Sequence, residues 1–192
     1  MPDTGAPWNI PYVAGTDLVA DWPTDNQTMA EAIADALDMA GAGIGSNIVQ
    51  ATKTNTQTIT STSLVDVTNL SATITPSSAT ARVLVIARVN YALDGGERAG
   101  FSLLRDSTEI FLANAAGSRG RATHAAISTT SDLLLDATMV YLDSPATASA
   151  TTYKVQGVVA ANTLYINRGG TDSNSASYWR GTSSLLVVEV AA

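Results

Sequence analysis

The chain has 192 residues, no cysteine and a formal net charge of −7. Without cysteine, disulfides, thiolate metal sites and a thiol nucleophile are excluded. The sequence contains no apolar run of the roughly 18 residues that a membrane-spanning helix needs, so we expect no membrane insertion. The N-terminus lacks a basic stretch followed by an apolar one, and we expect no signal peptide.

The charge is divided unevenly along the chain. Residues 1–46 carry seven acidic residues and no lysine or arginine, whereas residues 47–192 carry ten acidic and ten basic residues. A nucleic-acid-binding protein needs a basic face that displaces counterions. We therefore expect no nucleic-acid partner. The acidic N-terminal segment either docks on a basic partner or is solvated.

Residues 1–24 are predicted to form an extended arm. Four prolines disfavour a helix here. The segment is also rich in large apolar residues, which disordered tails usually lack. We interpret it as a docking arm that lies on its own body, on a sister subunit or on another protein. Its predicted anchors are Trp8, Ile10, Tyr12, Leu18 and Trp22.

Residues 25–41 are predicted to form an amphipathic helix. Met29, Ile33 and Leu37 recur at a spacing of four residues and give one apolar face. A helix of about fifteen residues is marginal in water by itself, so this face needs a partner. We favour a bundle with symmetry-related copies, a trimer collar, over packing on the chain's own body. The glycines that follow end the helix and make residues 42–46 a hinge rather than a dinucleotide-binding loop.

Residues 47–192 are predicted to be mainly β, an antiparallel sandwich or jelly roll. Apolar and polar residues alternate with a period of two, and turn residues separate the alternating segments. The last segment is apolar on both faces, which predicts a central strand or one at an interface. We expect about eight to ten strands. Some of the candidate strand ranges are expected to merge into one strand. The ranges are 48–60, 64–67, 70–75, 82–93, 99–105, 108–113, 122–129, 133–142, 151–160, 163–167 and 182–190.

Candidate catalytic and metal-binding residues are few. His124 is the only histidine, so a histidine-based metal site or triad lacks its other members, and we interpret His124 as an ordinary strand or loop residue. Asp132, Asp136 and Asp143 are the nearest group of carboxylates, and we expect turn or surface roles for them rather than glycoside hydrolysis. No HExxH, GxSxG or phosphate-binding loop occurs. We therefore predict no enzyme activity, no catalytic residue, no metal and no cofactor.

Two polar loops, residues 113–121 and 167–180, are the candidate binding regions. The first places two arginines between glycines, and the second ends in two aromatic residues and an arginine. Exposed aromatic rings beside amides and hydroxyls suit stacking and hydrogen bonding to a glycan. The alternative is that both are simply long loops, with a tryptophan packed at a subunit interface. The candidate receptor residues are Arg119, Arg121, Tyr178, Trp179 and Arg180.

The opening segment carries a family resemblance. GAPWNIPYVAGTDLVADWPTD, followed by an alanine-rich acidic helix and a glycine hinge, resembles the N-terminal region of tail-fibre and minor tail proteins of bacteriophages, especially those of actinobacteria. The segments TSTSLVDVTNLSATITPSSATARVLVIARVNYALD, FSLLRDSTEIF and TYKVQGVVAANTLYIN are similar to small β-sandwich modules of phage structural proteins. The resemblance implies an N-terminal segment that attaches to the virion and a trimeric body with a C1q/TNF-like jelly roll.

The same resemblance implies a function. The protein would be a virion structural protein, a tail fibre or minor tail protein, whose C-terminal knob contacts the host surface. Implied partners are two further copies of the chain, other virion proteins of the tail or capsid, and a host cell-surface glycan. Such a protein assembles in the host cytoplasm and leaves by lysis, so the implied localisation is the virion.

Two other functions stay open. Head fibres and capsid decoration proteins use the same plan of an anchor followed by a β-knob. A carbohydrate-active depolymerase is a third interpretation, and such enzymes generally have a longer repetitive body and an acidic cleft.

Overall fold

A computed structural model describes residues 27–33 and 47–190 of the chain. The chain divides into two compact units, Met1–Ser46 and Asn47–Ala192. In the first unit, residues 27–33 are helical, and the Gln27 side-chain amide donates a hydrogen bond to Glu31 Oε1 one turn later (2.8 Å). Met29 is partly exposed and Ile33 is 42 % exposed, so the face that they share is open to solvent. Within the described residues, no helix has the length and apolar character of a membrane span.

Several predictions for the first unit lie outside the described residues. These are the arm over residues 1–24, the remainder of the helix predicted over 25–41, and the hinge at 42–46. The individual side chains concerned are Trp8, Ile10, Tyr12, Leu18, Trp22 and Leu37.

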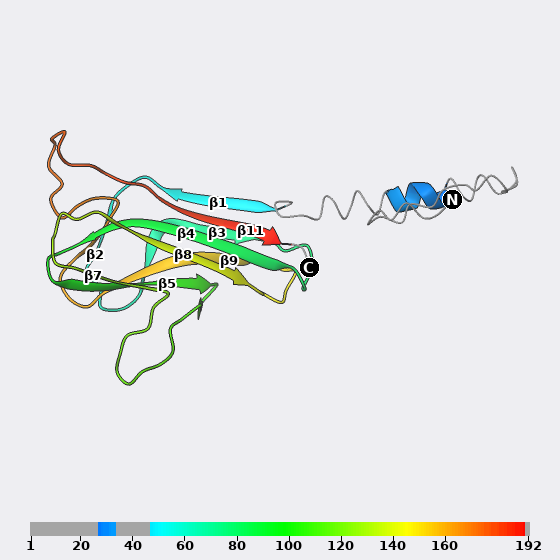
Figure 1. The fold of residues 1–192 in the computed structure, drawn as a ribbon, viewed down its shortest axis with the longest axis horizontal. Coiled ribbons are helices and arrows are strands. Elements are labelled where there is room, and N and C mark those ends of the chain that lie inside the picture. Colours follow the sequence, from blue (N-terminus) through cyan, green and yellow to red (C-terminus); the bar gives the residue numbers. More distant parts are fainter. Residues whose placement is uncertain (1–26, 34–46, 191–192) are drawn as a thin grey trace, which may run out of the picture. The chain divides into compact units, whose positions relative to one another are not determined.

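The described part of the second unit forms eleven strands in two antiparallel sheets (Figure 1). This confirms that the body is mainly β and antiparallel, as predicted. The strands are β1 (Ile48–Lys53), β2 (Gln57–Ile59), β3 (Val65–Ile74), β4 (Arg82–Leu93), β5 (Glu97–Arg105), β6 (Thr108–Ile110), β7 (His124–Ser128), β8 (Leu135–Asp143), β9 (Thr151–Val159), β10 (Leu164–Ile166) and β11 (Ser183–Val190).

Three of the sheet positions are held by interrupted strands. β10 and β11 pair one after the other with the same edge of β4, and β8 takes the opposite edge. β1 and β2 continue one another in the same way along β11 and β10. β6 and β7 follow each other along one edge of β5, whose other edge pairs with β9. Each sheet is therefore four strands wide.

Counting each interrupted strand once gives eight strands in chain order. The first sheet then has the order 1-8-3-6, and the second sheet has the order 2-7-4-5. Strand 1 pairs with strand 8, 2 with 7, 3 with 6 and 4 with 5, as in one long hairpin that has been rolled up. β11 is central between β1 and β4, which confirms one of the two positions predicted for this doubly apolar strand.

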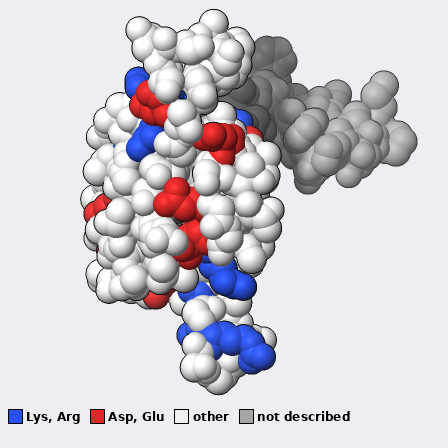
Figure 2. Space-filling view, turned by 90° about the vertical axis from the view of Figure 1, so that its left-hand side faces the viewer, with Lys and Arg blue, Asp and Glu red and all other residues white. Residues whose placement is uncertain are grey.

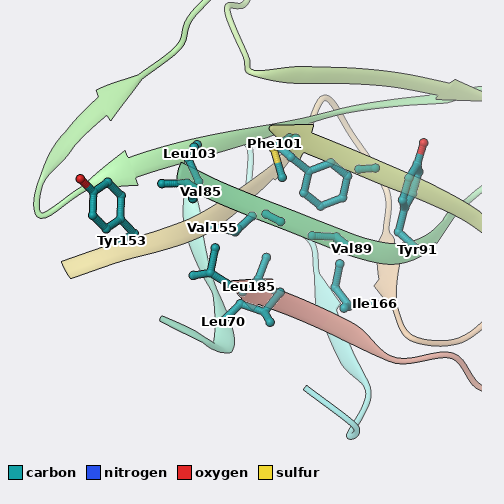
Figure 3. Close-up of a cluster of buried hydrophobic side chains, with 14 of the residues drawn as sticks. Leu70, Val85, Val89, Tyr91, Phe101, Leu103, Tyr153, Val155, Ile166 and Leu185 are labelled. Carbon is teal, nitrogen blue, oxygen red and sulfur yellow. The ribbon is translucent and has the colours of Figure 1, made fainter. Parts of the chain in front are cut away.

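The two sheets pack face to face over a hydrophobic core. Alternate residues of each strand point inward, as the period-two pattern predicts. Full burial of such a side chain stabilises the fold by about 1.5–3 kcal/mol. Figure 3 shows this interior, to which the two sheets contribute Leu70, Val85, Val89, Tyr91, Phe101, Leu103, Tyr153, Val155, Ile166 and Leu185.

The ranges predicted over 64–67 and 70–75 are among those that merge. They form one strand, β3, whose pairing with β9 shifts register between Asp66 and Ser71. Asn69 lies within this bulge with a φ of 67°, in the left-handed region that asparagine tolerates better than most residues. A bulge inserts extra residues into a strand without ending it. The extra residues interrupt the alternation of apolar and polar positions, so the sequence pattern indicates two strands instead of one.

Two other predicted strands, 48–60 and 108–113, are shorter than expected. The first is interrupted at residues 54–56, where the carbonyls of Lys53 and Asn55 accept hydrogen bonds from the side chain of Asn167. The second ends at Ile110, because Phe111 has a φ of 55° and turns the chain out of the sheet.

Glu189 ties the start of the body to its end. Its carboxylate accepts hydrogen bonds from the backbone N–H (2.8 Å) and the hydroxyl of Ser77, and from the side chain of Asn47 (3.3 Å). The side chain is 2 % exposed. The hydrogen bond from the Ser77 hydroxyl is the main cause that holds the pKa of Glu189 below its ordinary value.

This depressed pKa predicts a pH-dependent stability. The unfolded chain has the ordinary glutamate pKa, so the contribution of Glu189 is complete above that value and is lost as pH falls through the lower pKa of the folded state. We expect the free energy of unfolding in urea to fall between about pH 5 and pH 3, and Glu189→Gln to flatten that fall. An equal pH slope in wild type and variant would contradict the assignment.

Candidate functional site

Both predicted binding regions lie in loops that interrupt a strand. The tip loop, residues 167–182, separates β10 from β11 in the first sheet, and the side loop, residues 111–123, separates β6 from β7 in the second. They project from opposite sides of the sandwich (Figures 1 and 2). The structure therefore does not bring the two predicted groups of residues together.

The tip loop begins at a buried asparagine. Asn167 is fully buried with a φ of 60°, and its side-chain amide donates to the carbonyls of Lys53 (2.9 Å) and Asn55 (3.0 Å). Its side-chain oxygen accepts a hydrogen bond from Ser183 Oγ (2.6 Å). The backbone N–H of Gly181 closes the loop by donating to the Asn167 carbonyl (3.0 Å). One side chain thus fixes both ends of the loop to the neighbouring strand.

Two further contacts orient the tip loop. The Arg168 guanidinium lies 4.4 Å from the centre of the Tyr165 ring and donates to Thr58 Oγ1 (3.2 Å). Asp132 accepts hydrogen bonds from the backbone N–H (2.6 Å) and the hydroxyl (3.1 Å) of Thr171. Asp132 precedes β8, so these contacts hold the loop over the connection between β7 and β8.

The outer part of the tip loop is held by an ion pair. Arg180 donates from Nε (3.0 Å) and Nη2 (2.7 Å) to the two carboxylate oxygens of Asp172. The hydrogen bond from Arg180 is the main cause that lowers the pKa of Asp172, and the same contact raises the pKa of Arg180. Because both groups are at the surface, we interpret the pair as a brace for the loop rather than a source of overall stability.

This brace frames a polar hollow with an aromatic wall. The hollow has a volume of about 470 Å³ and is lined only by tip-loop residues. Trp179 is 76 % exposed and Tyr178 is 44 % exposed, so both rings are free to contact a ligand. A ring face beside hydroxyls and an amide can stack on the C–H face of a sugar while its hydroxyl groups are hydrogen-bonded. The lining residues are Asp172, Ser173, Asn174, Ser175, Tyr178, Trp179 and Arg180.

The tip loop lies away from the end at which the chain enters the sandwich. β1 starts at Ile48 opposite Val188, near the C-terminal end of β11, whereas β10 lies against the C-terminal end of β4 at Leu93. Figure 1 accordingly shows the start of β1 at one end of the sandwich and the tip loop towards the other.

The side loop uses its arginines partly for its own structure. Arg119 Nη1 donates to the Ala116 carbonyl (3.2 Å), and Arg121 Nε donates to the Ala113 carbonyl (2.7 Å). Figure 2, which looks onto the end remote from the start of β1, shows basic side chains on the lower projection that this loop forms. A groove of about 440 Å³ with an apolar floor lies beside the loop, lined by residues that include Arg121 and Arg98. Sequence reasoning did not identify Arg98, which comes from β5.

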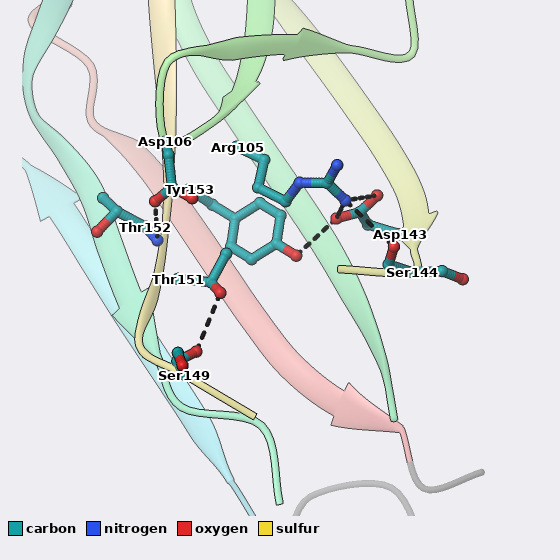
Figure 4. Close-up of polar contacts among 8 residues, drawn as sticks. All are labelled: Arg105, Asp106, Asp143, Ser144, Ser149, Thr151, Thr152 and Tyr153. Carbon is teal, nitrogen blue, oxygen red and sulfur yellow. Dashed lines mark hydrogen bonds and ion pairs between the residues drawn. The ribbon is translucent and has the colours of Figure 1, made fainter. Parts of the chain in front are cut away.

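The carboxylates that are near one another in sequence have separate structural roles. Asp132 caps the tip loop, Asp136 pairs with Arg88 (2.8 Å), and Asp143 binds Arg105 and Tyr153 (Figure 4). His124 begins β7, with its ring 6.4 Å from that of Tyr91 and 6.3 Å from that of Phe101. It is a strand residue, in agreement with the prediction of a strand or loop histidine, and its ring packs near two core aromatic rings. Among the described residues, no cluster of three or more potential metal ligands occurs.

Sequence reasoning found part of the hollow. It singled out Tyr178, Trp179 and Arg180, which the structure places in one wall, but it did not identify the partner of Arg180. Asp172 lies eight residues before Arg180, a spacing that indicates no contact until the loop is known to fold back on itself. The string DSNS at 172–175 was the available signal, because it gathers hydroxyl, amide and carboxylate groups in one segment.

No protein-family model matches the chain, and a search of curated proteins finds no matching relative.

Proposed function

We propose that the chain is a structural protein of a bacteriophage virion, a tail fibre or minor tail protein, whose knob contacts the host surface through the tip loop. One observation carries this proposal: the tip loop presents Trp179 and Tyr178 beside a polar hollow, on a braced segment remote from the point where the chain enters the sandwich. This arrangement leaves one end of the knob for attachment and the other for recognition. The acidic first 46 residues supply the attachment segment in this proposal.

We also propose that the body is a jelly roll of the C1q/TNF type and that three copies assemble. The strand orders 1-8-3-6 and 2-7-4-5 support the jelly roll, because a rolled eight-stranded hairpin has this pairing. The open face of helix 27–33, with Ile33 42 % exposed, supports a trimer collar. The partners are then two further copies, another virion protein and a host glycan, and no enzyme activity is needed.

Glycan binding is tested by Trp179→Ala. Stacking on an exposed indole contributes roughly 1–2 kcal/mol, so we expect affinity for the best ligand on an array of bacterial surface glycans to fall by about five- to thirtyfold. Ile127→Ala is the matched control, because Ile127 is 57 % exposed on β7 and does not line the hollow. Equal binding by Trp179→Ala and wild type would exclude the tip loop as the receptor site.

Placement on the particle is tested by gold labelling of intact virions with an antibody against the knob. Label at the tail supports the fibre or minor tail protein. Label over the head would assign the chain to capsid decoration or head fibres, which fit the same plan of anchor and knob. A particle without label would overturn the virion proposal itself.

A further inference from the structure

The lining of the tip-loop hollow contains one basic and one acidic side chain, and these two are bound to each other. Arg180 donates from Nε (3.0 Å) and Nη2 (2.7 Å) to the two carboxylate oxygens of Asp172. The other lining residues are two serines, an asparagine, a tyrosine and a tryptophan, all without charge. The lining therefore has no net charge.

The other cation of the tip loop, Arg168, is used elsewhere. Its guanidinium donates to the carbonyls of Gly169 (3.2 Å) and Gly170 (3.3 Å) and to Thr58 Oγ1 (3.2 Å), and it does not line the hollow. In Figure 2, acidic and basic side chains lie together at the upper projection, which the tip loop forms, whereas basic ones mark the lower projection. A ligand that enters the hollow thus meets no guanidinium that lacks a partner.

A neutral sugar matches this lining in both directions of hydrogen bonding. Each sugar hydroxyl is both a donor and an acceptor. Asp172 keeps lone pairs beside its two bonds from Arg180, and the brace leaves the Nη1 donors of Arg180 unused. Hydrogen bonds to charged groups are stronger than those between neutral groups. The pair therefore offers a strong acceptor and a strong donor to neighbouring hydroxyls of one ring that stacks on Trp179.

An acidic sugar matches the same lining poorly. A carboxylate or phosphate group supplies acceptors only, so it cannot donate to Asp172, and the two negative charges repel each other at short range. The Nε–Nη2 edge of Arg180, which could hold the group with two parallel bonds, is already occupied. An acidic group can take this edge only by displacing Asp172 and leaving that carboxylate without its partner.

We propose that the tip loop selects neutral glycans and that Asp172 is the residue that excludes acidic ones. This step rests on the proposed function, because it specifies the ligand of the same hollow. The ligand is a hexose-type sugar with neighbouring free hydroxyls. Glycans whose exposed sugars carry carboxylate or phosphate groups are rejected. Asp172 is then a specificity determinant as well as one half of the brace.

Matched pairs on a glycan array test the selection. In each pair a terminal glucose, galactose or mannose is replaced by its uronic acid, so that a carboxylate takes the place of the hydroxymethyl group. We expect the full-length wild type to bind the neutral member at least about fivefold more tightly. Binding of the neutral member should change little between about 50 and 500 mM NaCl, because no net charge is involved.

The two ways in which this experiment can fail are distinct. Equal or tighter binding of the acidic members by wild type would overturn the selection and leave the tip loop as the receptor site. A wild type that bound no glycan at all would overturn the proposed receptor function, and the selection with it.

Replacing Asp172 by asparagine is expected to reverse the selection. Asp172→Asn keeps the shape of the side chain and removes its charge, so the Arg180 guanidinium becomes available to a ligand carboxylate. We expect the ratio of acidic to neutral binding to rise by about fivefold or more, in a salt-sensitive manner. Adding Arg180→Gln to Asp172→Asn should abolish this gain.

Asp132→Asn is the matched control. Asp132 also braces the tip loop, by accepting two hydrogen bonds from Thr171 (2.6 and 3.1 Å), but it does not line the hollow. Loss of a brace alone lowers affinity for both members of a pair, so a change in the ratio identifies a role in specificity. An unchanged ratio with Asp172→Asn, or an equal change with Asp132→Asn, would contradict the proposal.

Discussion

Replacing Asp143 by alanine is expected to lower the free energy of unfolding by about 3 kcal/mol, measured in urea at neutral pH. The Asp143 carboxylate is buried and receives Tyr153 OH at 2.7 Å and Arg105 Nη1 at 2.9 and 3.1 Å (Figure 4). It comes from β8 of the first sheet, whereas Arg105 and Tyr153 come from the second sheet. Removing it therefore breaks a polar link between the two sheets.

The expected loss comes mainly from the partners that are left behind. Tyr153 is fully buried, and burial, together with its hydrogen bond to Asp143, raises the pKa of its phenol. The hydroxyl therefore stays protonated and would lack its acceptor in the variant. Arg105 is 29 % exposed, so water can solvate part of its charge, which places the loss at the lower end of the range for buried pairs.

Two further variants separate the causes. Tyr153→Phe removes one hydrogen bond and leaves the ion pair intact, so we expect a loss of about 1 kcal/mol. Asp66→Ala removes an exposed pair with Lys154 (3.0 Å) and an exposed hydrogen bond from Gln156 (2.6 Å), and together these should cost no more than about 1 kcal/mol. If Asp143→Ala were no more destabilising than Asp66→Ala, the link between the sheets would not contribute as we infer.

The strands were predictable because their burial alternates residue by residue. In β4, the residues from Val83 to Leu93 that share one face form part of the core, as the sequence pattern indicates. It was harder to predict from the sequence where a strand continues and where it ends. The bulge at Asn69 and the left-handed turn at Phe111 depend on one backbone angle each, and such angles leave only a weak trace in the residue pattern.

The candidate site was predictable in composition and not in position. Trp179 and its neighbours stand out as aromatic and polar residues in one segment, but their loop could have followed any strand. The position of the loop is set by the pairing of β10 and β11 with the same edge of β4. Pairing between segments separated by more than sixty residues is a property of the whole fold, because many registers satisfy the same alternation.

The two loops show how this body can vary without refolding. The first residue of each loop, Asn167 in the tip loop and Phe111 in the side loop, has a left-handed backbone conformation. After the tip loop the chain pairs again with β4, and after the side loop it pairs again with β5. The core is therefore largely independent of loop length and composition, since loop closure costs only slowly more as a loop grows. A surface whose recognition loops change while its scaffold stays constant suits the proposed contact with a host.

Replacing Asn167 by alanine is the corresponding test of the tip loop, and we expect it to lower the free energy of unfolding by about 3–5 kcal/mol. The variant leaves the buried Lys53 carbonyl, the Asn55 carbonyl and the Ser183 hydroxyl without the partner that they have in wild type. It also keeps a Cβ at a φ of 60° while removing the amide group that compensates for this backbone conformation. Urea unfolding gives the total, and hydrogen exchange of residues 168–182 shows whether the loop opens first.

Asn167→Gly separates the two causes, because glycine accepts the left-handed angle and lacks the hydrogen bonds. We expect it to be about 1 kcal/mol less destabilising than Asn167→Ala, with the remainder of the loss assigned to the bonds. Asn162→Ala is the matched control: Asn162 has a φ of 52° but is exposed and donates one side-chain hydrogen bond, to Glu97 (3.1 Å). It should lose about 1–2 kcal/mol and leave the tip loop protected. A loss at Asn167 no larger than the loss at Asn162 would mean that the side-chain network does not anchor the loop, and the hollow beside Trp179 would then need another source of rigidity.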